Sequence, residues 1–269
     1  MEKIIILPKL KLVIKNFKTS IKNYFKYMKI LAFDSCNSWL SVALTEDKKT
    51  IAISNIFDNQ KQSELLISEI EKILQSCNIW YQQLDAIITN RGPSSFTSVR
   101  IGLSVAKTIA IASKIPVLAC DYFEIIAYQY LQNQWLNQFA NNNQEVPMII
   151  VLDASNEEFF CQEFLITDKD NDCKSIKRID QPYLANFANI EEKLSKSSFL
   201  IGGPAKISIA NQCQKKNINY FINPQNEKLE ANYFAEFALE KLNDKNFSIE
   251  SLKNLEPLYI RNPNISSRK

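Results

Sequence analysis

The stretch that most constrains the fold runs from Asn90 to Lys107 and reads NRGPSSFTSVRIGLSVAK. It follows an apolar run, residues 84–89, that is typical of a buried strand. The stretch opens with the turn dipeptide Gly92-Pro93 and continues with helical periodicity, and Ser94 or Ser95 is placed to cap the helix. The sequence therefore predicts a helix N-terminus at the carboxyl end of a strand, where open α/β sheets usually bind their ligands.

The segments around this stretch give the order β-β-β-α-β-α-β-α. Three closely spaced apolar runs before it predict an antiparallel meander. A helix with Ser63 as its cap follows the meander, and a strand and a helix follow the stretch. The expected strands are 30–33, 40–44, 50–56, 84–89 and 115–119, and the expected helices are 63–74, 97–113 and 122–140.

The second half of the chain repeats the start of this pattern. The polar segment 141–145, NNNQE, is a candidate linker. After it, the apolar run 148–152 ends in Asp153-Ala154-Ser155-Asn156, just as the run 30–33 ends in Asp34-Ser35-Cys36-Asn37. Strands at 159–165 and 199–201 and helices at 205–214 and 231–242 are expected beyond it. The pattern indicates an internal duplication, with domains at 28–140 and 146–269.

The composition excludes several classes of function. The chain has no histidine, which rules out a histidine metal site, a Ser-His-Asp triad and a histidine base. Its 4 glycines cannot form a Rossmann fingerprint or a P-loop. The 6 cysteines are scattered without a CxxC pair, which favours reduced thiols in a cytoplasm over a disulfide framework or a zinc cluster.

Residues 1–27 form a basic leader. They carry seven lysines and one acid, a net charge of +6, and the whole chain is +3, so the remainder is −3. One interpretation is a basic arm or an amphipathic surface helix for a membrane or RNA. The leader lacks arginine and a small-residue cleavage site, so it is a poor signal or transit peptide. We expect translation to start at Met28, with the leader disordered or not translated.

Asp34 and Asp153 close equivalent strands in the two predicted domains. On one hypothesis they face a shared cleft, in which the carboxylates hold Mg²⁺ through water and backbone N–H groups of turns such as that at Ser35 hold a nucleotide phosphate. On the other, each Asp begins a β-turn and accepts bonds from nearby backbone N–H groups. The sequence leaves both open.

The stretch itself also has alternatives. Arg91 and Arg100 are suited to an anion or to an acidic residue of a partner. Phe96 packs either into the protein's own core or into an interface. Ser95 is a poor nucleophile, because no histidine can activate it and the sequence is not GxSxG.

The helices 63–74 and 97–113 are expected to flank one sheet. Small or apolar residues are predicted on their second faces: Ile67, Ser104, Ala106 and Ala110. Such faces allow another helix to approach, which suggests an oligomer or heteromer surface. A monomer with ordinary surface alanines explains them nearly as well.

Together, these segments resemble the TsaB (YeaZ) family of bacterial partner proteins in tRNA threonylcarbamoyladenosine synthesis. Residues 91–102, RGPSSFTSVRIG, with Ala106-Lys107 beyond, resemble the family's GRGPGSFTGLRIG…AKGLA signature. Shorter segments also match: ILAFDS at 30–35, SELL at 63–66, LDAI at 84–87, VLDA at 151–154 and PLYIR at 257–261. The resemblance spans about Met28 to Arg261 and excludes the leader.

The resemblance implies an α/β fold of the actin-like ATPase (ASKHA) type, with two ribonuclease-H-like domains. It implies a cytoplasmic, non-catalytic scaffold that contacts no membrane and tRNA only indirectly. Its expected partners are a TsaD-type catalytic paralogue, bound through the N-terminal domain, and a TsaE-type small ATPase, with a homodimer when alone.

The same resemblance fixes the expected site. The partner-interface residues would be Arg91, Ser95, Phe96, Thr97, Arg100, Leu66 and Ile67, with no catalytic residue and no metal ligand. No intrinsic cofactor is expected, although ATP or ADP with Mg²⁺ is a candidate at the subunit interface. The alternative is a stand-alone actin-like ATPase or small-molecule kinase with Asp34 or Asp153 as its base. A peptidase lacks both metal ligands and an activated nucleophile.

The chain departs from the family pattern at four positions. Asn90, Ser94 and Ser98 replace signature glycines, and Gln62 replaces a histidine. If those glycines allow close backbone approach, contacts with a nucleotide or a partner are altered here.

Overall fold

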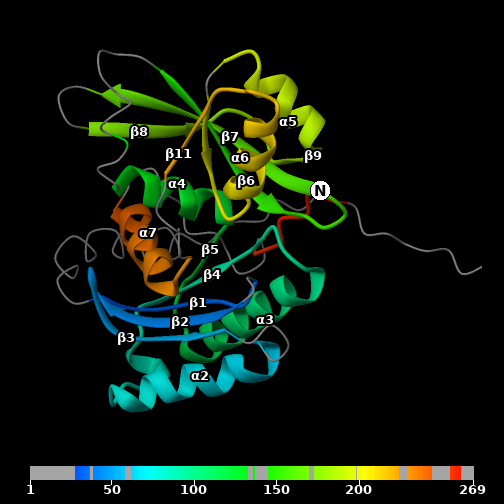
Figure 1. Cartoon of the computed structure of the whole chain (residues 1–269). Helices are drawn as coiled ribbons and strands as arrows, with labels where there is room; N and C mark the ends of the chain where they lie inside the picture. Colours follow the sequence, from blue (N-terminus) through cyan, green and yellow to red (C-terminus); the bar gives the residue numbers. More distant parts are fainter. Residues whose placement is uncertain are drawn as a thin grey trace, which may run out of the picture.

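The computed structural model describes residues 28–36, 39–57, 62–132, 136, 145–169, 173–197, 199–223, 229–243 and 255–261. The leader, most of the predicted linker and Asn37 lie outside these residues, so the predictions made for them are not tested. The helix predicted to begin with Ser63 as its cap begins at Gln62, so Ser63 lies inside the helix and that prediction is wrong. The described chain forms two sheets stacked one above the other, with helices between them and on their outer faces (Figure 1). Among the described residues, no helix is long and apolar enough to cross a membrane.

The first sheet has five strands in the order β3-β2-β1-β4-β5. Strand β1 is antiparallel to β2, as β2 is to β3, and β1, β4 and β5 run parallel to one another. The central strands are apolar along nearly their whole length because both faces of the sheet are covered. The strands are β1 (Lys29–Asp34), β2 (Leu40–Glu46), β3 (Lys49–Ile56), β4 (Ala86–Asn90) and β5 (Val117–Cys120).

Helices cover both faces of this sheet. Helices α2 (Gln62–Ser76) and α3 (Phe96–Ser113) lie on the outer face, and a short 3-10 helix, η1 (Tyr81–Gln83), precedes β4. Helices α4 (Tyr122–Gln132) and α7 (Ala231–Asn243) lie between the two sheets (Figure 1). Gly102 lets α3 approach the sheet closely, since a Cβ there would lie 2.9 Å from the Ser35 hydroxyl.

The second sheet repeats the topology of the first. Its order is β11-β10-β6-β7-β8, and an additional strand, β9, pairs with β7. Strand β6 is antiparallel to β7 and parallel to β10. In the first sheet, β1 is likewise antiparallel to β2 and parallel to β4. The predicted internal duplication is therefore confirmed. The elements are β6 (Val146–Asp153), β7 (Glu158–Lys169), β8 (Cys173–Arg178), β9 (Tyr183–Asn186), α5 (Phe187–Leu194), β10 (Phe199–Gly202), α6 (Lys206–Lys215) and β11 (Tyr220–Ile222).

The larger apolar core joins the two halves. It includes the first sheet, α4, α7 and the face of the second sheet that turns toward them, for example Phe33, Phe123, Met148 and Phe234. A smaller core lies on the other face of the second sheet, beneath α5 and α6. Helix α7 comes from the second half of the sequence but packs against β1 and β2, so the two halves interlock.

Candidate functional site

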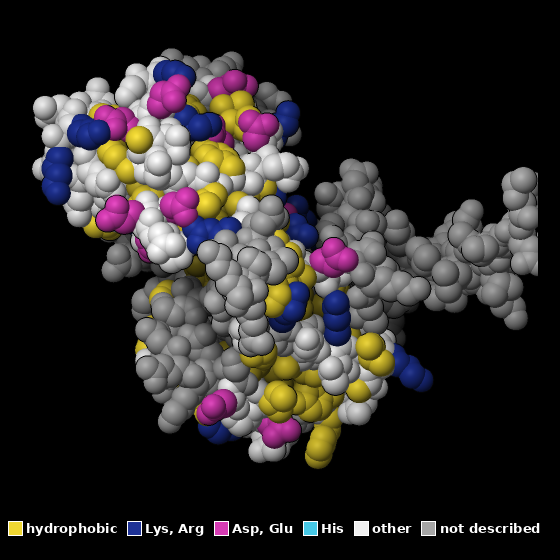
Figure 2. Space-filling model, turned by 90° about the vertical axis from the view of Figure 1, so that its right-hand side faces the viewer, with side chains coloured by type: hydrophobic (Ala, Val, Ile, Leu, Met, Phe, Trp, Pro, Cys, Tyr) yellow, Lys and Arg dark blue, Asp and Glu magenta, His cyan; other side chains and the backbone are white. Residues whose placement is uncertain are grey.

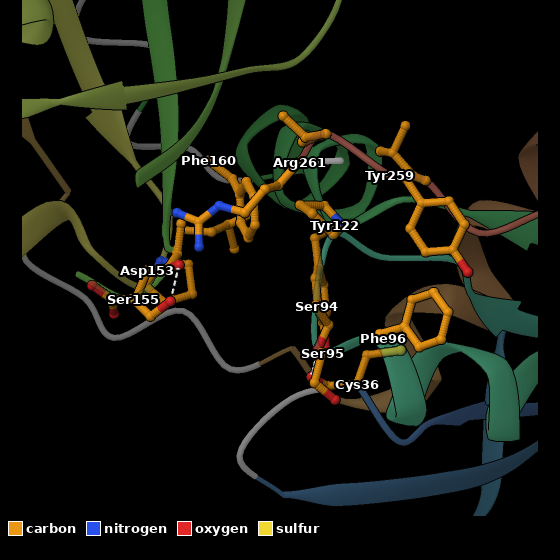
Figure 3. Close-up of a pocket in the computed structure, with 16 residues that line it drawn as sticks. Cys36, Ser94, Ser95, Phe96, Tyr122, Asp153, Ser155, Phe160, Tyr259 and Arg261 are labelled. Carbon is orange, nitrogen blue, oxygen red and sulfur yellow. Dashed lines mark hydrogen bonds between the residues drawn. The ribbon is translucent and has the colours of Figure 1, made fainter. Parts of the chain in front are cut away.

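A cleft of about 690 Å³ lies between the two sheets, where parallel strands of both end (Figure 3). The segments that follow β1, β4, β5, β6 and β10 all contribute to it. This is the edge at which the sequence predicted a site. The lining residues are Cys36, Pro93, Ser94, Ser95, Phe96, Tyr122, Leu152, Asp153, Ala154, Ser155, Phe160, Pro204, Leu258, Tyr259, Ile260 and Arg261.

The turn into α3 is held by its own backbone and by two serines. Gly92 has φ +106°, which a glycine adopts without strain, and its N–H donates to Asn90 Oδ1 at 2.7 Å. The Ser94 hydroxyl donates to the Cys36 carbonyl, and Ser95 caps α3 by accepting from the Ser98 N–H at 3.2 Å. Of the two serines, Ser95 is therefore the helix cap.

Asp34 is a buried structural carboxylate, and the hypothesis that it serves the cleft as a ligand is wrong. Its side chain has no exposed surface. It accepts hydrogen bonds from the Tyr122 hydroxyl at 2.5 Å, the Cys36 N–H at 2.8 Å and Asn90 Nδ2 at 3.3 Å. Burial raises the pKa of Asp34 to about 6, and these hydrogen bonds oppose the rise. The turn-forming alternative is confirmed for this residue.

Ser35 is also unavailable to a phosphate in the cleft. It is 1% exposed, and its hydroxyl donates to the Ser98 carbonyl at 3.3 Å, which joins the first turn of α3 to the end of β1.

Asp153, at the equivalent end of β6, is exposed and lines the cleft. The turn that follows it holds three consecutive residues in the left-handed region, Ser155, Asn156 and Glu157. Asp153 and Arg261 are the charged residues among those that line the cleft, and Arg261 is paired with Glu158. An exposed carboxylate repels the phosphates of a nucleotide unless Mg²⁺ lies between them, and Arg261 is already paired, so nucleotide binding at this turn stays a prediction. Within the described chain, no three Cys, Asp or Glu side chains gather to hold a metal ion.

Arg91 faces an acid of its own chain. Its Nη2 lies 3.6 Å from Asp121 Oδ2, and Arg178 of β8 donates to both oxygens of the same carboxylate at 2.8 and 3.0 Å. Asp121 is fully buried, so this triad links the first half of the chain to the second. About a quarter of the Arg91 side chain stays exposed (27%), and its predicted contact with a partner stays a prediction.

Phe96 and Arg100 form an exposed cluster with a residue from the C-terminal segment. The guanidinium carbon of Arg100 lies 3.5 Å from the centre of the Phe96 ring, and Arg100 Nε donates to the Tyr259 hydroxyl at 2.9 Å. The Phe96 and Tyr259 rings stack with their centres 5.5 Å apart. Phe96 is 45% exposed, so of the two alternatives given for it, packing into the protein's own core is wrong, and its place in an interface stays a prediction.

The remaining predicted interface residues divide into exposed and buried. Thr97 and Ile67 are exposed, Ile67 at 54%. Leu66 is 0% exposed, because it lies on the face of α2 that packs against the sheet, and the prediction that it belongs to a partner surface is wrong. The same holds for Ala106 and Ala110 on α3, at 0% and 1%, whereas Ser104 is exposed as predicted.

Residues 54–248 match the family model described as "TsaD: tRNA N6-adenosine threonylcarbamoyltransferase", which is well over half of the chain. The chain belongs to this family. Its relatives include proteins named tRNA threonylcarbamoyladenosine biosynthesis protein TsaB. The Bacillus subtilis protein of that name is 34% identical over 100 residues, 37% of this chain and 44% of the relative. The Escherichia coli protein is 26% identical over 137 residues, 51% and 55% of the two chains.

The solved structure of YeaZ from Pseudomonas aeruginosa shares the fold. It superposes with a TM-score of 0.62 at 18% identity and covers 86% of this chain and 99% of YeaZ. The resemblance to the TsaB (YeaZ) family and the predicted ASKHA-type fold are thus confirmed. The chain spans about half the length of the curated relatives it matches.

Proposed function

We propose that this TsaB-type chain is a non-catalytic scaffold and activator in the complex that installs threonylcarbamoyl on the adenosine next to the anticodon of tRNA. Its partner would be a TsaD-type transferase, joined by a TsaE-type small ATPase. The chain would form a homodimer when alone and would act in the cytoplasm, touching tRNA only indirectly.

The proposal rests on the observation that polar groups in and beside the cleft are already hydrogen-bonded or ion-paired within the protein. Asp34 is buried under Tyr122, Ser94 donates to a backbone carbonyl, and Arg261 is paired with Glu158. A transferase or kinase needs a base and charge-stabilising groups free to meet a substrate. The stand-alone kinase alternative would rely on Asp153 alone.

The outer surface of α2 and α3 has exposed side chains suited to binding a partner protein. On the face shown in Figure 2, hydrophobic side chains gather on the lower part of the molecule, the half that holds α2 and α3 in Figure 1. Ile67, Phe96, Thr97 and Arg100 are exposed on these two helices. A half-exposed aromatic ring beside an arginine is typical of the residues that dominate binding energy at interfaces. We assign the partner surface to these residues.

The surface can be tested by measuring the affinity of the full-length chain for its TsaD-type paralogue. We expect Phe96→Ala and Arg100→Ala each to weaken binding by roughly tenfold to a hundredfold, as central interface residues do. Ile207→Ala is the matched control, because Ile207 is similarly exposed (48%) but lies on α6 of the second half. Unchanged affinity for both α3 variants, or an equal loss with the control, would refute the assignment.

ATP or ADP with Mg²⁺ remains a candidate at the interface with the partner. Titration calorimetry of the isolated chain with MgATP separates the scaffold from the kinase alternative. We expect no heat of specific binding, because the cation that lines the cleft is already paired with Glu158. Saturable binding that is lost in Asp153→Asn would favour the kinase.

A further inference from the structure

The C-terminal segment 255–261 contains the sequence PLYIR, which the resemblance singled out and to which the proposed function gives no role. It is an irregular segment that follows the last described helix in the chain and returns to the cleft. Four of its residues, Leu258 to Arg261, line the cleft, so the segment crosses the space between the two halves of the protein (Figure 3).

One end of the segment is fixed to the first half. Leu255 is 1% exposed and anchors the segment in the larger core, which joins both halves. The contacts after it are with the first half. The Leu258 N–H donates to the Arg91 carbonyl at 2.7 Å, in the turn that leads into α3. Tyr259 then stacks on Phe96 and accepts from Arg100. The segment therefore packs against the first turn of α3, where the exposed aromatic cluster lies.

The other end is fixed to the second half. Arg261 donates to the carboxylate of Glu158, the first residue of β7. Figure 3 shows Arg261 on the side of the cleft that holds Asp153 and Phe160, with Tyr259 and Phe96 on the opposite side. Two residues apart in sequence, Tyr259 and Arg261 thus hold opposite walls of the same cleft.

We infer that residues 255–261 act as a strap that ties the β6–β7 turn to the first turn of α3, so that the position of the second half controls the order of the exposed Phe96–Arg100 cluster. The strap is a property of the isolated chain. Its effect on a partner rests on the proposed function, because that function places the partner on the same cluster. Tyr259 and Arg261 are accordingly positioning residues.

Hydrogen exchange of the full-length chain, followed by mass spectrometry, tests the strap directly. Arg261→Ala removes the bond to Glu158 of β7, which lies on the side of the cleft opposite α3, yet the strap predicts faster exchange of the amides of residues 94–100. We expect a change of roughly twofold to fivefold, the range that follows from losing one partly exposed ion pair. Arg261→Lys, which keeps the charge, should restore most of the protection, and Glu256→Ala, an exposed residue of the same segment, should have no effect.

A double-mutant cycle distinguishes a strap from two separate contacts. If Tyr259 and Arg261 hold the segment in series, adding Arg261→Ala to Tyr259→Ala changes exchange in residues 94–100 little further. Additive effects, or faster exchange only around Glu158 and Arg261, would overturn the inference. Affinity for the TsaD-type paralogue is then measured on the same variants. A strap seen by exchange with unchanged affinity would refute the proposed partner surface and leave the strap standing.

Discussion

Replacing Asp34 by asparagine tests whether the end of β1 is a structural turn or a ligand site. Asp34 is fully buried, and its raised pKa means that the folded protein binds a proton there more tightly than the unfolded chain does. This group therefore adds stability as the pH falls from its folded pKa toward 3.8, and that stability is lost as the pH rises through about 6.

The expected magnitude follows from the two pKa values. The pKa of Asp34 is about 6 in the folded protein and 3.8 ordinarily. By linkage, this group alone makes the free energy of unfolding about 2 kcal/mol larger at about pH 4.5 than at about pH 7.5. The asparagine side chain of the variant would be of similar shape but would not titrate. The difference in unfolding free energy between Asp34→Asn and the parent, from urea denaturation at both pH values, should therefore shift by about 2 kcal/mol in favour of the variant at the higher pH.

Asp153→Asn is the matched control, since Asp153 ends the equivalent strand of the second sheet with its side chain exposed. We expect it to change the unfolding free energy by less than about 0.5 kcal/mol, as surface substitutions usually do. If the parent and Asp34→Asn show the same pH dependence, Asp34 is not held as a desolvated structural carboxylate, and a ligand site at the end of β1 is again open.

Four further substitutions have expected outcomes. Leu66→Ala should lower the unfolding free energy by about 2–5 kcal/mol, because its side chain is fully buried, and this is checked by denaturant unfolding. Its neighbour Ile67→Ala should cost less than about 1 kcal/mol and should instead weaken binding of the TsaD-type paralogue, measured by titration. Gly203→Ala should destabilise by more than about 2 kcal/mol in the same unfolding assay, since φ is +95° and a Cβ would lie 2.4 Å from a β6 carbonyl oxygen. Gly102→Ala should cost less than Gly203→Ala, because the atom it meets is a serine hydroxyl that can rotate. Equal losses for the two glycine variants would contradict this.

The first half of the fold followed from the sequence because its apolar runs are long and its turns carry clear signals. The meander, α2 and α3 were all predicted to within a few residues, and the cap of α3 is Ser95, one of the two serines proposed for it. Strand β4 begins later than predicted, at Ala86, because η1 precedes it.

The second half was predicted less completely. Strand β8 reads CKSIKR and lies at the edge of its sheet, so it lacks the apolar alternation of a half-buried strand. Strands β9 and β11 have 4 and 3 residues, too few for a periodic pattern. Helix α5, of 8 residues, was missed as well.

The site depended on contacts that no local pattern contains. The sequence placed the cleft correctly but left open whether Asp34 faces it, because the answer depends on Tyr122, far along the chain, which covers the carboxylate. Tyr259 completes the cluster of Phe96 and Arg100. It lies far from them in the sequence, so their contact could not be predicted from a local pattern. The PLYIR motif, which contains Tyr259, was the sequence feature that could have pointed to this contact.

The central claim, that this chain is a scaffold rather than an enzyme, is tested most directly by reconstituting tRNA threonylcarbamoylation from purified components. The account predicts no modified tRNA from this chain with its substrates alone, and modification by the TsaD-type paralogue and the TsaE-type ATPase that depends on adding it. The dependence should be weakened by Phe96→Ala and unaffected by Ile207→Ala. Modification that proceeds equally well without this chain, or that this chain catalyses without the paralogue, would contradict the account.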